Sequence, residues 1–339
     1  MKVLIWHMHG GYTDALVRGA HTYVLPVNDE RDAWGGGLHG RDWPRAREAA
    51  FADLAEAEID LVVLQRPEEV ALTARLTGRT PGRDLPAVYL EHNTPKPDAT
   101  GTRHPMADRS DVMIVHVTHH NRVFWDNGRA PVRVVPHGVP DPGRRYLGDL
   151  ERLAVVINEP IRRGRVTGTD LLPALAAAAP VDVFGMKAEG LAAHLGVTEE
   201  EVAAAGDLRP VDLHRELARR RAYVHPYRWT SLGLSLLEAM HLGMPVVGLA
   251  TTEAPRAVPP EAGFLSNDID ELVAELRRLR ADPAYAAARG RDARAYALRH
   301  HSHDAFIRRW DDVFSEAVAA GAESRSVAAP ADAGERRSR

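Results

Sequence analysis

The strongest chemical pattern in this sequence lies between residues 223 and 250, which read as a strand, a glycine-containing loop, a helix and a second strand. The loop residues Ser231–Leu234 precede the helix, so their amides can bind a phosphate or a sugar hydroxyl. Glu238 stands inside the otherwise apolar helix, where an unpaired carboxylate would be costly. Two ribose hydroxyls would explain this carboxylate, and so would an ordinary cationic partner.

Three other segments follow predicted strands and are candidates for binding. His92 follows the strand Ala87–Glu91, and His137 follows the strand Val132–Val135. Gly10 and Gly11 lie between the first strand and a possible helix, where small residues let the backbone approach a phosphate. Because ligands of open α/β sheets bind at the carboxyl ends of strands, these positions are candidates for a functional role. A structural or exposed histidine and a plain tight turn are the alternatives.

Other patterns do not have the context that their chemistry needs. Gly35, Gly37 and Gly40 match a dinucleotide-binding fingerprint but lie in a long loop, and a mobile loop is a better interpretation than a dinucleotide site. The histidine-rich segments 116–120 and 300–303 lack a metal-ligand spacing with a carboxylate, so we expect no metal site. No G-x-S-x-G elbow is present, and a serine hydrolase is not predicted.

These residues must be positioned by two series of alternating strands and helices, typical of parallel sheets covered by helices. Expected strands in the first half are Val3–Trp6, Leu61–Leu64, Ala87–Glu91, Val112–His116 and Val132–Val135, with a helix at Arg45–Glu58. The second half is expected to hold strands Leu153–Ile157, Val181–Phe184, Ala222–His225 and Pro245–Ala250, and helices Asp170–Ala178, Val211–Arg220, Leu232–Leu242, Ile269–Ala281, Pro283–Leu298 and Asp304–Ala319. A Pro- and Gly-rich segment near residues 139–150 separates the halves.

Length and composition are consistent with this division. A chain of 339 residues with 45% hydrophobic and 27% charged residues predicts a globular protein of two domains. The net charge of −4 argues against a nucleic-acid partner, and the absence of cysteine excludes disulfides and thiolate chemistry. No apolar run approaches the roughly 20 residues that span a bilayer, and we expect a cytoplasmic protein.

The segment around Glu238 resembles the GT-B glycosyltransferases of family 4, a group that includes many bacterial enzymes. That family has an E-x7-E motif followed by A-M-x-x-G-x-P-V-V. Glu238 and the residues after it, including Gly243 and Pro245, match the second Glu and its sequel. Thr230 stands where the first Glu would be, which changes how the hydroxyls of the donor sugar are held.

Further segments agree with this family in order and spacing over most of residues 1–315. Gly10 and Gly11 resemble its N-terminal glycine loop, His137 replaces the Asn of its V-I-P-N-G-V segment, and His92 stands where it places a sugar-facing His. Residues 162–172 resemble its R-x4-K-G-x-x-x-L phosphate clamp, with Thr167 at the Lys position. Arg163 or Arg165 would then supply the second cation, although a solvated basic turn is the alternative.

The resemblance implies an α/β protein of the GT-B fold, with two Rossmann-like domains facing each other across a cleft. Expected bounds are 1–145 for the acceptor-side domain, 146–300 for the nucleotide-sugar domain, 301–320 for a helix crossing back to the first domain and 321–339 for a disordered tail. The implied reaction is a metal-independent transfer with retention of configuration. Catalytic positions would be His92, Arg162, Arg163 and Glu238, and donor-binding positions would be Gly10, Gly11, His137, Arg165, Thr230, Ser231, Leu232, Gly233, Leu234 and Glu238.

The sequence leaves other functions open. Loss of one Glu and one Lys is also expected of a GT-B protein that binds a nucleotide or glycan without turnover, and a nucleotide-sugar epimerase or phosphorylase is a further alternative. The donor is expected to be a nucleoside-diphosphate sugar, with no separate cofactor. The acceptor could be a glycan, a lipid or a small metabolite, and Arg219–Arg221 or Tyr227–Trp229 could contact a membrane surface.

Overall fold

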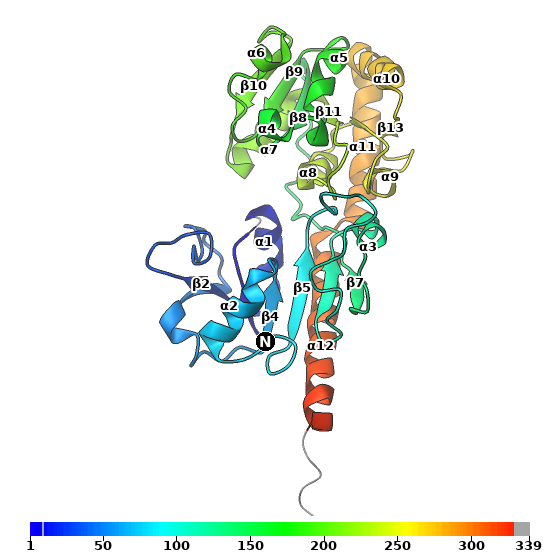
Figure 1. The fold of residues 1–339 in the computed structure, drawn as a ribbon. Helices are drawn as coiled ribbons and strands as arrows, with labels where there is room; N and C mark the ends of the chain where they lie inside the picture. The colour runs from blue at the N-terminus through cyan, green and yellow to red at the C-terminus, as the bar shows by residue number, and fades with distance from the viewer. Residues whose placement is uncertain (9, 329–339) are drawn as a thin grey trace, which may run out of the picture. The chain divides into compact units, whose positions relative to one another are not determined.

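The computed structural model describes residues 1–8 and 10–328, which form two compact units. Unit 1 contains Met1–Pro136 and the chain from Phe306 onward, and unit 2 contains His137–Ala305 (Figure 1). The expected boundary after residue 145 therefore differs from the structural one. Arg294 binds Asp141, and the Leu242 carbonyl accepts the amides of Arg145 and Tyr146, so residues 141–146 are tied to unit 2.

Unit 1 is built on a parallel sheet with the strand order β3-β2-β1-β4-β5-β6-β7. Its strands are β1 (Lys2–Ile5), β2 (Thr22–Val27), β3 (Ala46–Ala50), β4 (Leu61–Leu64), β5 (Ala87–Glu91), β6 (Met113–His116) and β7 (Val132–Val134). Its helices are α1 (Gly10–Leu16), α2 (Glu68–Thr77), α3 (His119–Phe124) and the short 3-10 helix η1 (Phe51–Asp53). The central strands are fully buried and read as continuous apolar runs, as expected of a sheet covered on both faces.

The predicted helix Arg45–Glu58 is wrong, because this segment forms β3 and η1. β3 pairs with β2 along its whole length, from Tyr23 opposite Ala46 to Val27 opposite Ala50. Backbone hydrogen bonds to a neighbouring strand thus outweigh the helix propensity of the alanines. β2 itself is not predicted by the sequence, in which Pro26 interrupts a short apolar run.

Unit 2 is built on a second parallel sheet with the order β10-β9-β8-β11-β12-β13. Its strands are β8 (Leu150–Val156), β9 (Val181–Phe184), β10 (Val202–Gly206), β11 (Arg220–His225), β12 (Val246–Gly248) and β13 (Phe264–Leu265). Its helices are α4 (Pro160–Arg163), α5 (Leu172–Ala176), α6 (Leu191–Leu195), α7 (Pro210–Arg219), α8 (Leu234–Leu242), α9 (Ala254–Ala257), α10 (Ile269–Ala281) and α11 (Pro283–His300), with 3-10 helices η2 (Gly164–Thr167) and η3 (Thr169–Leu171). Apolar side chains of α5, α8, α10 and α11 pack against this sheet.

The last helix, α12 (His303–Ala328), belongs to unit 1 from Phe306 onward. Trp310 is buried there, and its Nε1 donates to the Tyr12 hydroxyl at 3.0 Å. The helix extends through the first eight residues of the predicted disordered tail, and residues 329–339 of that tail lie outside the described residues. No helix of the described chain is long and apolar enough to cross a membrane.

Candidate functional site

The candidate site of unit 2 lies at the carboxyl ends of β8 and β11. These strands are neighbours in the sheet, and the strand order runs away from them in opposite directions. A crevice at such a switch point is the usual ligand site of an open parallel sheet. Residues 157–168 follow β8 and residues 226–233 follow β11, so the fold brings the predicted arginine segment and the predicted glycine loop to one edge.

These two loops are joined by backbone contacts. The amides of Arg228 and Trp229 donate to the Val166 carbonyl at 3.0 and 3.2 Å. Gly168 has a φ of 74°, and a Cβ there would lie 1.9 Å from the carbonyl oxygen of Pro226. Only glycine fits so close to the second loop in this left-handed conformation. The sequence alone could not predict this contact, which holds the arginines beside the glycine loop.

The three predicted arginines have different surroundings. Arg162 binds Glu159, and the pKa of Glu159 is lowered to about 2 by Arg162 and by Lys187, whose Nζ lies 2.8 Å from the carboxylate. Arg165 binds Asp170 at 2.8 Å, and Arg228 binds the same carboxylate.

Arg163 lies differently. Its guanidinium carbon is 5.9 Å from the centre of the Tyr227 ring, and within residues 1–8 and 10–328 no ion pair reaches it. The Tyr227 hydroxyl donates to the Val156 carbonyl at 2.5 Å, so this ring is held at the end of β8. Arg163 is therefore the arginine of this segment whose charge remains available to an anionic ligand.

Thr167, at the expected lysine position, brings no positive charge to this edge. The residue is fully buried, and its Oγ1 donates to the Gly164 carbonyl at 3.2 Å and lies 3.2 Å from the Thr169 hydroxyl. This position supports the turn. Lys187 and Arg228 bring further positive charge to the same edge, and their strand-end positions after β9 and β11 are the signal that could have identified them.

The loop before α8 carries polar groups that the described protein atoms do not fully satisfy. Gly233 is the N-terminal cap of α8. The Oγ1 of Thr230 is buried and has no hydrogen-bond partner in the described part of the chain. A buried polar atom without a partner is uncommon in a folded protein and is expected where a ligand completes the hydrogen bonds.

Glu238 projects from the second turn of α8. Its side chain is 23% exposed, and His214 of α7 lies near it, with Nε2 at 3.7 Å from the carboxylate. Among residues 1–8 and 10–328 no arginine or lysine pairs with this carboxylate. The neighbour of this carboxylate is therefore a histidine at a loose distance, and the carboxylate retains capacity to accept hydrogen bonds.

His137 is buried in unit 2, near the C-terminal end of α11. The amide of Val139 donates to the His301 carbonyl at 3.2 Å. His137 is the first residue of unit 2.

Unit 1 has a second cluster, at the carboxyl ends of β1, β4 and β5. Gly10 and Gly11 open α1, and a Cβ on Gly10 would lie 3.4 Å from Arg41 and 3.8 Å from His7. Burial, with His39 and Arg41 nearby, lowers the pKa of His7 to about 4. This side chain is therefore neutral at physiological pH, and Arg41 brings positive charge to the glycines.

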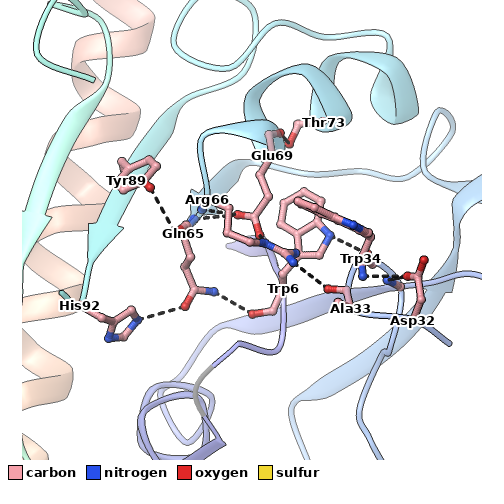
Figure 2. A network of polar contacts seen from close by, with 11 residues as sticks. Trp6, Asp32, Ala33, Trp34, Gln65, Arg66, Glu69, Thr73, Tyr89 and His92 are labelled. Carbon is pink, nitrogen blue, oxygen red and sulfur yellow. Dashed lines mark hydrogen bonds and ion pairs between the residues drawn. The ribbon is translucent and has the colours of Figure 1, made fainter. Parts of the chain in front are cut away.

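His92 lies at the same edge of the unit 1 sheet, directly after β5. Its Nε2 is 3.1 Å from Gln65 Oε1 (Figure 2). Its ring meets the Tyr12 ring edge-on, with 4.7 Å between the ring centres. Gln65 and Arg41 are functional candidates that sequence reasoning missed. For Gln65 the available signal was its place immediately after the strand Leu61–Leu64.

Glycines 35, 37 and 40 lie in a loop that no helix follows. Glu48 of β3 holds this loop, because its carboxylate accepts the Leu38 amide at 2.9 Å and binds Arg31 at 2.8 Å. This loop therefore lacks the helix that a dinucleotide-binding glycine loop precedes. The described residues contain no group of three or more His, Asp or Glu side chains that could hold a metal ion.

Comparison with known proteins identifies the domain that carries Glu238. Residues 169–282 match the family described as glycosyl transferases group 1. The match includes the loop Thr230–Leu234 and Glu238, and it begins directly after the arginine segment. It indicates a transferase. No curated protein matches the chain in sequence.

Three solved structures illustrate the similarity in fold. Sucrose-phosphate synthase from Thermosynechococcus elongatus is 16% identical with a TM-score of 0.71, over 94% of this chain and 100% of that chain. HepE from Anabaena, solved in complex with UDP-glucose, is 17% identical with a TM-score of 0.71, over 93% and 100%. A glycosyltransferase from Rickettsia africae is 11% identical with a TM-score of 0.69, over 94% and 98%. The chain has the GT-B fold, with two parallel-sheet α/β domains.

Proposed function

We propose that this protein transfers a sugar from a UDP-sugar to an acceptor hydroxyl, with retention of configuration and without a metal ion. The observation that carries the proposal is the switch point of unit 2, where Arg163, the glycine loop and Glu238 come from one glycosyl transferases group 1 domain and its adjoining turn. The choice of UDP is supported by the UDP-glucose complex of HepE.

Each side chain has a role that follows from its charge. The Glu238 carboxylate accepts hydrogen bonds from the two ribose hydroxyls. Arg163 and the amides of residues 231–234 bind the diphosphate. Thr230 Oγ1, which is buried without a partner in the described chain, binds a hydroxyl or phosphate oxygen of the donor.

In the reaction, the bond between the anomeric carbon and the β-phosphate oxygen breaks as the acceptor oxygen attacks that carbon. The bonding electrons remain with the departing diphosphate, whose oxygen takes the acceptor proton. Negative charge grows on the diphosphate in the transition state, so a fixed guanidinium lowers the barrier more than it stabilises the ground state. In this proposal His92 orients the sugar, and the backbone at Gly10 and Gly11 supports the phosphate and the sugar.

The donor proposal is tested by thermal unfolding with UDP, GDP, ADP and dTDP in turn. A ligand at about 100 times its Kd adds about 2.7 kcal/mol to the free energy of unfolding. We expect UDP to raise the Tm of the native protein, and Glu238→Ala to lose most of that shift. Glu199→Ala is the matched control, because Glu199 is exposed and lies on a loop before β10. Equal shifts in both variants would reject Glu238 as the ribose ligand.

A second candidate is supported by Thr230 and Thr167, which stand where the resembled family has acidic and basic residues. A protein that binds UDP without turnover would show the Tm shift and would release no UDP from UDP-glucose. We expect measurable UDP release, increased by a competent acceptor. The acceptor class and a cytoplasmic location stay predictions.

A further inference from the structure

Gln65 connects three neighbouring strands at the carboxyl edge of the unit 1 sheet. It directly follows β4, which lies between β1 and β5. Its side-chain Nε2 donates to the Trp6 carbonyl after β1 at 2.7 Å, and its Oε1 lies 3.1 Å from His92 Nε2 after β5. Figure 2 shows this amide between the two partners.

The identity of these partners determines which ring nitrogen of His92 carries hydrogen. A backbone carbonyl can only accept, so the Gln65 amide nitrogen must face Trp6 and the amide oxygen must face His92. An amide oxygen can only accept as well. His92 must therefore donate from Nε2, and in the neutral ring Nδ1 is the acceptor nitrogen.

The backbone of Gln65 is also held by hydrogen bonds. Its backbone N–H donates to Glu69 Oε2 at 2.6 Å, and its backbone carbonyl accepts from the Tyr89 hydroxyl at 3.2 Å. The Glu69 side chain is fully buried and also binds Arg66, whose guanidinium stacks on the Trp34 ring at 3.7 Å (Figure 2). A flip of the Gln65 side-chain amide would place two acceptors opposite each other at Trp6 and would lose this part-buried hydrogen bond.

We propose that Gln65 is a positioning residue that holds His92 in the tautomer with hydrogen on Nε2 and thereby fixes the orientation of the His92 ring toward the sugar. The sugar as partner rests on the proposed function, whereas the tautomer follows from the hydrogen bonds of unit 1.

The tautomer is tested without any ligand. Long-range proton–nitrogen NMR spectra of protein labelled on histidine, with the His92 signals assigned from their loss in His92→Asn, distinguish a protonated Nε2 from a protonated Nδ1. We expect protonated Nε2 and unprotonated Nδ1 in the native protein above pH 7. Gln65→Met removes both amide partners at similar size and should shift these resonances. Tyr89→Phe removes a neighbouring bond to the Gln65 backbone and should leave them unchanged.

The functional part uses UDP-glucose as the probe. Gln65→Met should lower kcat/KM by about 100-fold because the ring loses its orientation, while the Tm shift caused by UDP stays that of the native protein. Gln65→Glu keeps an acceptor toward His92 and should recover part of the rate. Protonated Nδ1 in the native protein, or identical His92 spectra in the native protein and in a folded Gln65→Met, would overturn the proposal. Absence of any UDP effect would overturn the proposed function and leave the tautomer result intact.

Discussion

Arg163 differs from its neighbours because its charge is not matched by a carboxylate of the described chain, whereas Arg162 and Arg165 each face one. A diphosphate that binds Arg165 must compete with Asp170, whose pKa is lowered by Arg228 and Arg165, so that the carboxylate stays charged. The same reasoning applies to Arg162 and Glu159. At the residue scale, the contribution of each arginine to diphosphate binding depends on its existing partners.

We therefore expect Arg163→Met to weaken UDP binding by about 10- to 100-fold, the cost of a charge-assisted hydrogen bond. Arg165→Met is the matched control and should change the Kd by less than about 3-fold. Isothermal titration calorimetry with UDP measures both values. A larger loss in Arg165→Met than in Arg163→Met would show that the ligand displaces Asp170 and that the free charge of Arg163 is not used.

At the scale of elements, the nucleotide site depends on the close contact between the loop after β8 and the loop after β11. Gly168 and Gly190 provide a matched pair for testing this contact, since both have a φ of 74°. A Cβ at Gly168 would collide with the Pro226 carbonyl, whereas a Cβ at Gly190 meets no atom within 4 Å. Both changes to alanine strain the backbone, but only one of them pushes the loops apart.

Gly190→Ala should lower the free energy of unfolding by about 1 kcal/mol, from backbone strain alone. Gly168→Ala should cost about 2 kcal/mol more, because the backbone must shift to relieve the collision. It should also abolish the increase in the free energy of unfolding that UDP causes. Chemical denaturation with and without UDP measures both effects. Equal stability of the two variants would mean that the loops adapt and are not held by Gly168.

At Arg45–Glu58, pairing with a neighbouring strand outweighs the helix propensity of the segment. Alanine and arginine favour a helix, yet residues 46–50 form an edge strand because β2 offers them a complete row of backbone partners. In contrast, α10 has the expected bounds, Ile269–Ala281, because an aspartate cap and a periodic apolar face are both encoded within the helix.

At the scale of the whole molecule, buried histidines in both units couple the fold to pH. Burial lowers the pKa of His116 to about 4, of His225 to about 3 and of His301 to about 4. In the unfolded chain these groups titrate near 6.5, so between pH 6.5 and pH 4 the unfolded state binds more protons. The free energy of unfolding therefore falls as the pH falls through this window. Glu48 and Glu159, with pKa values lowered to about 2, add to this loss only below about pH 4.5.

We expect the Tm to be nearly constant from pH 8 to pH 7 and to drop by several degrees between pH 6.5 and pH 5 at constant ionic strength. Each buried histidine contributes about 1.4 kcal/mol per pH unit well below pH 6.5. His225→Gln should reduce the slope, and the exposed His300→Gln should leave it unchanged. A Tm that stays level down to pH 5 would contradict neutral burial of these rings.

The sequence by itself determined the fold class, most of the inner strands and the chemical character of the segment around Glu238. Buried parallel strands are continuous apolar runs, and a glycine loop before an apolar helix is a local pattern. Such patterns are encoded in consecutive residues, so they can be recognised without knowing which distant residues they contact. The family match over residues 169–282 rests on the same kind of information.

Only the tertiary structure decided which polar groups are already paired. The sequence places three arginines, at positions 162, 163 and 165, close together. In the structure Glu159 pairs with Arg162 and Asp170 pairs with Arg165, whereas Arg163 lies near the Tyr227 ring and has no carboxylate partner in the described chain. Likewise, Gln65 and His92 are 27 residues apart and meet because β4 and β5 are neighbours. The physical reason is that hydrogen bonds and ion pairs act over a few ångströms, and the folding of the sheet determines which distant side chains come within that range.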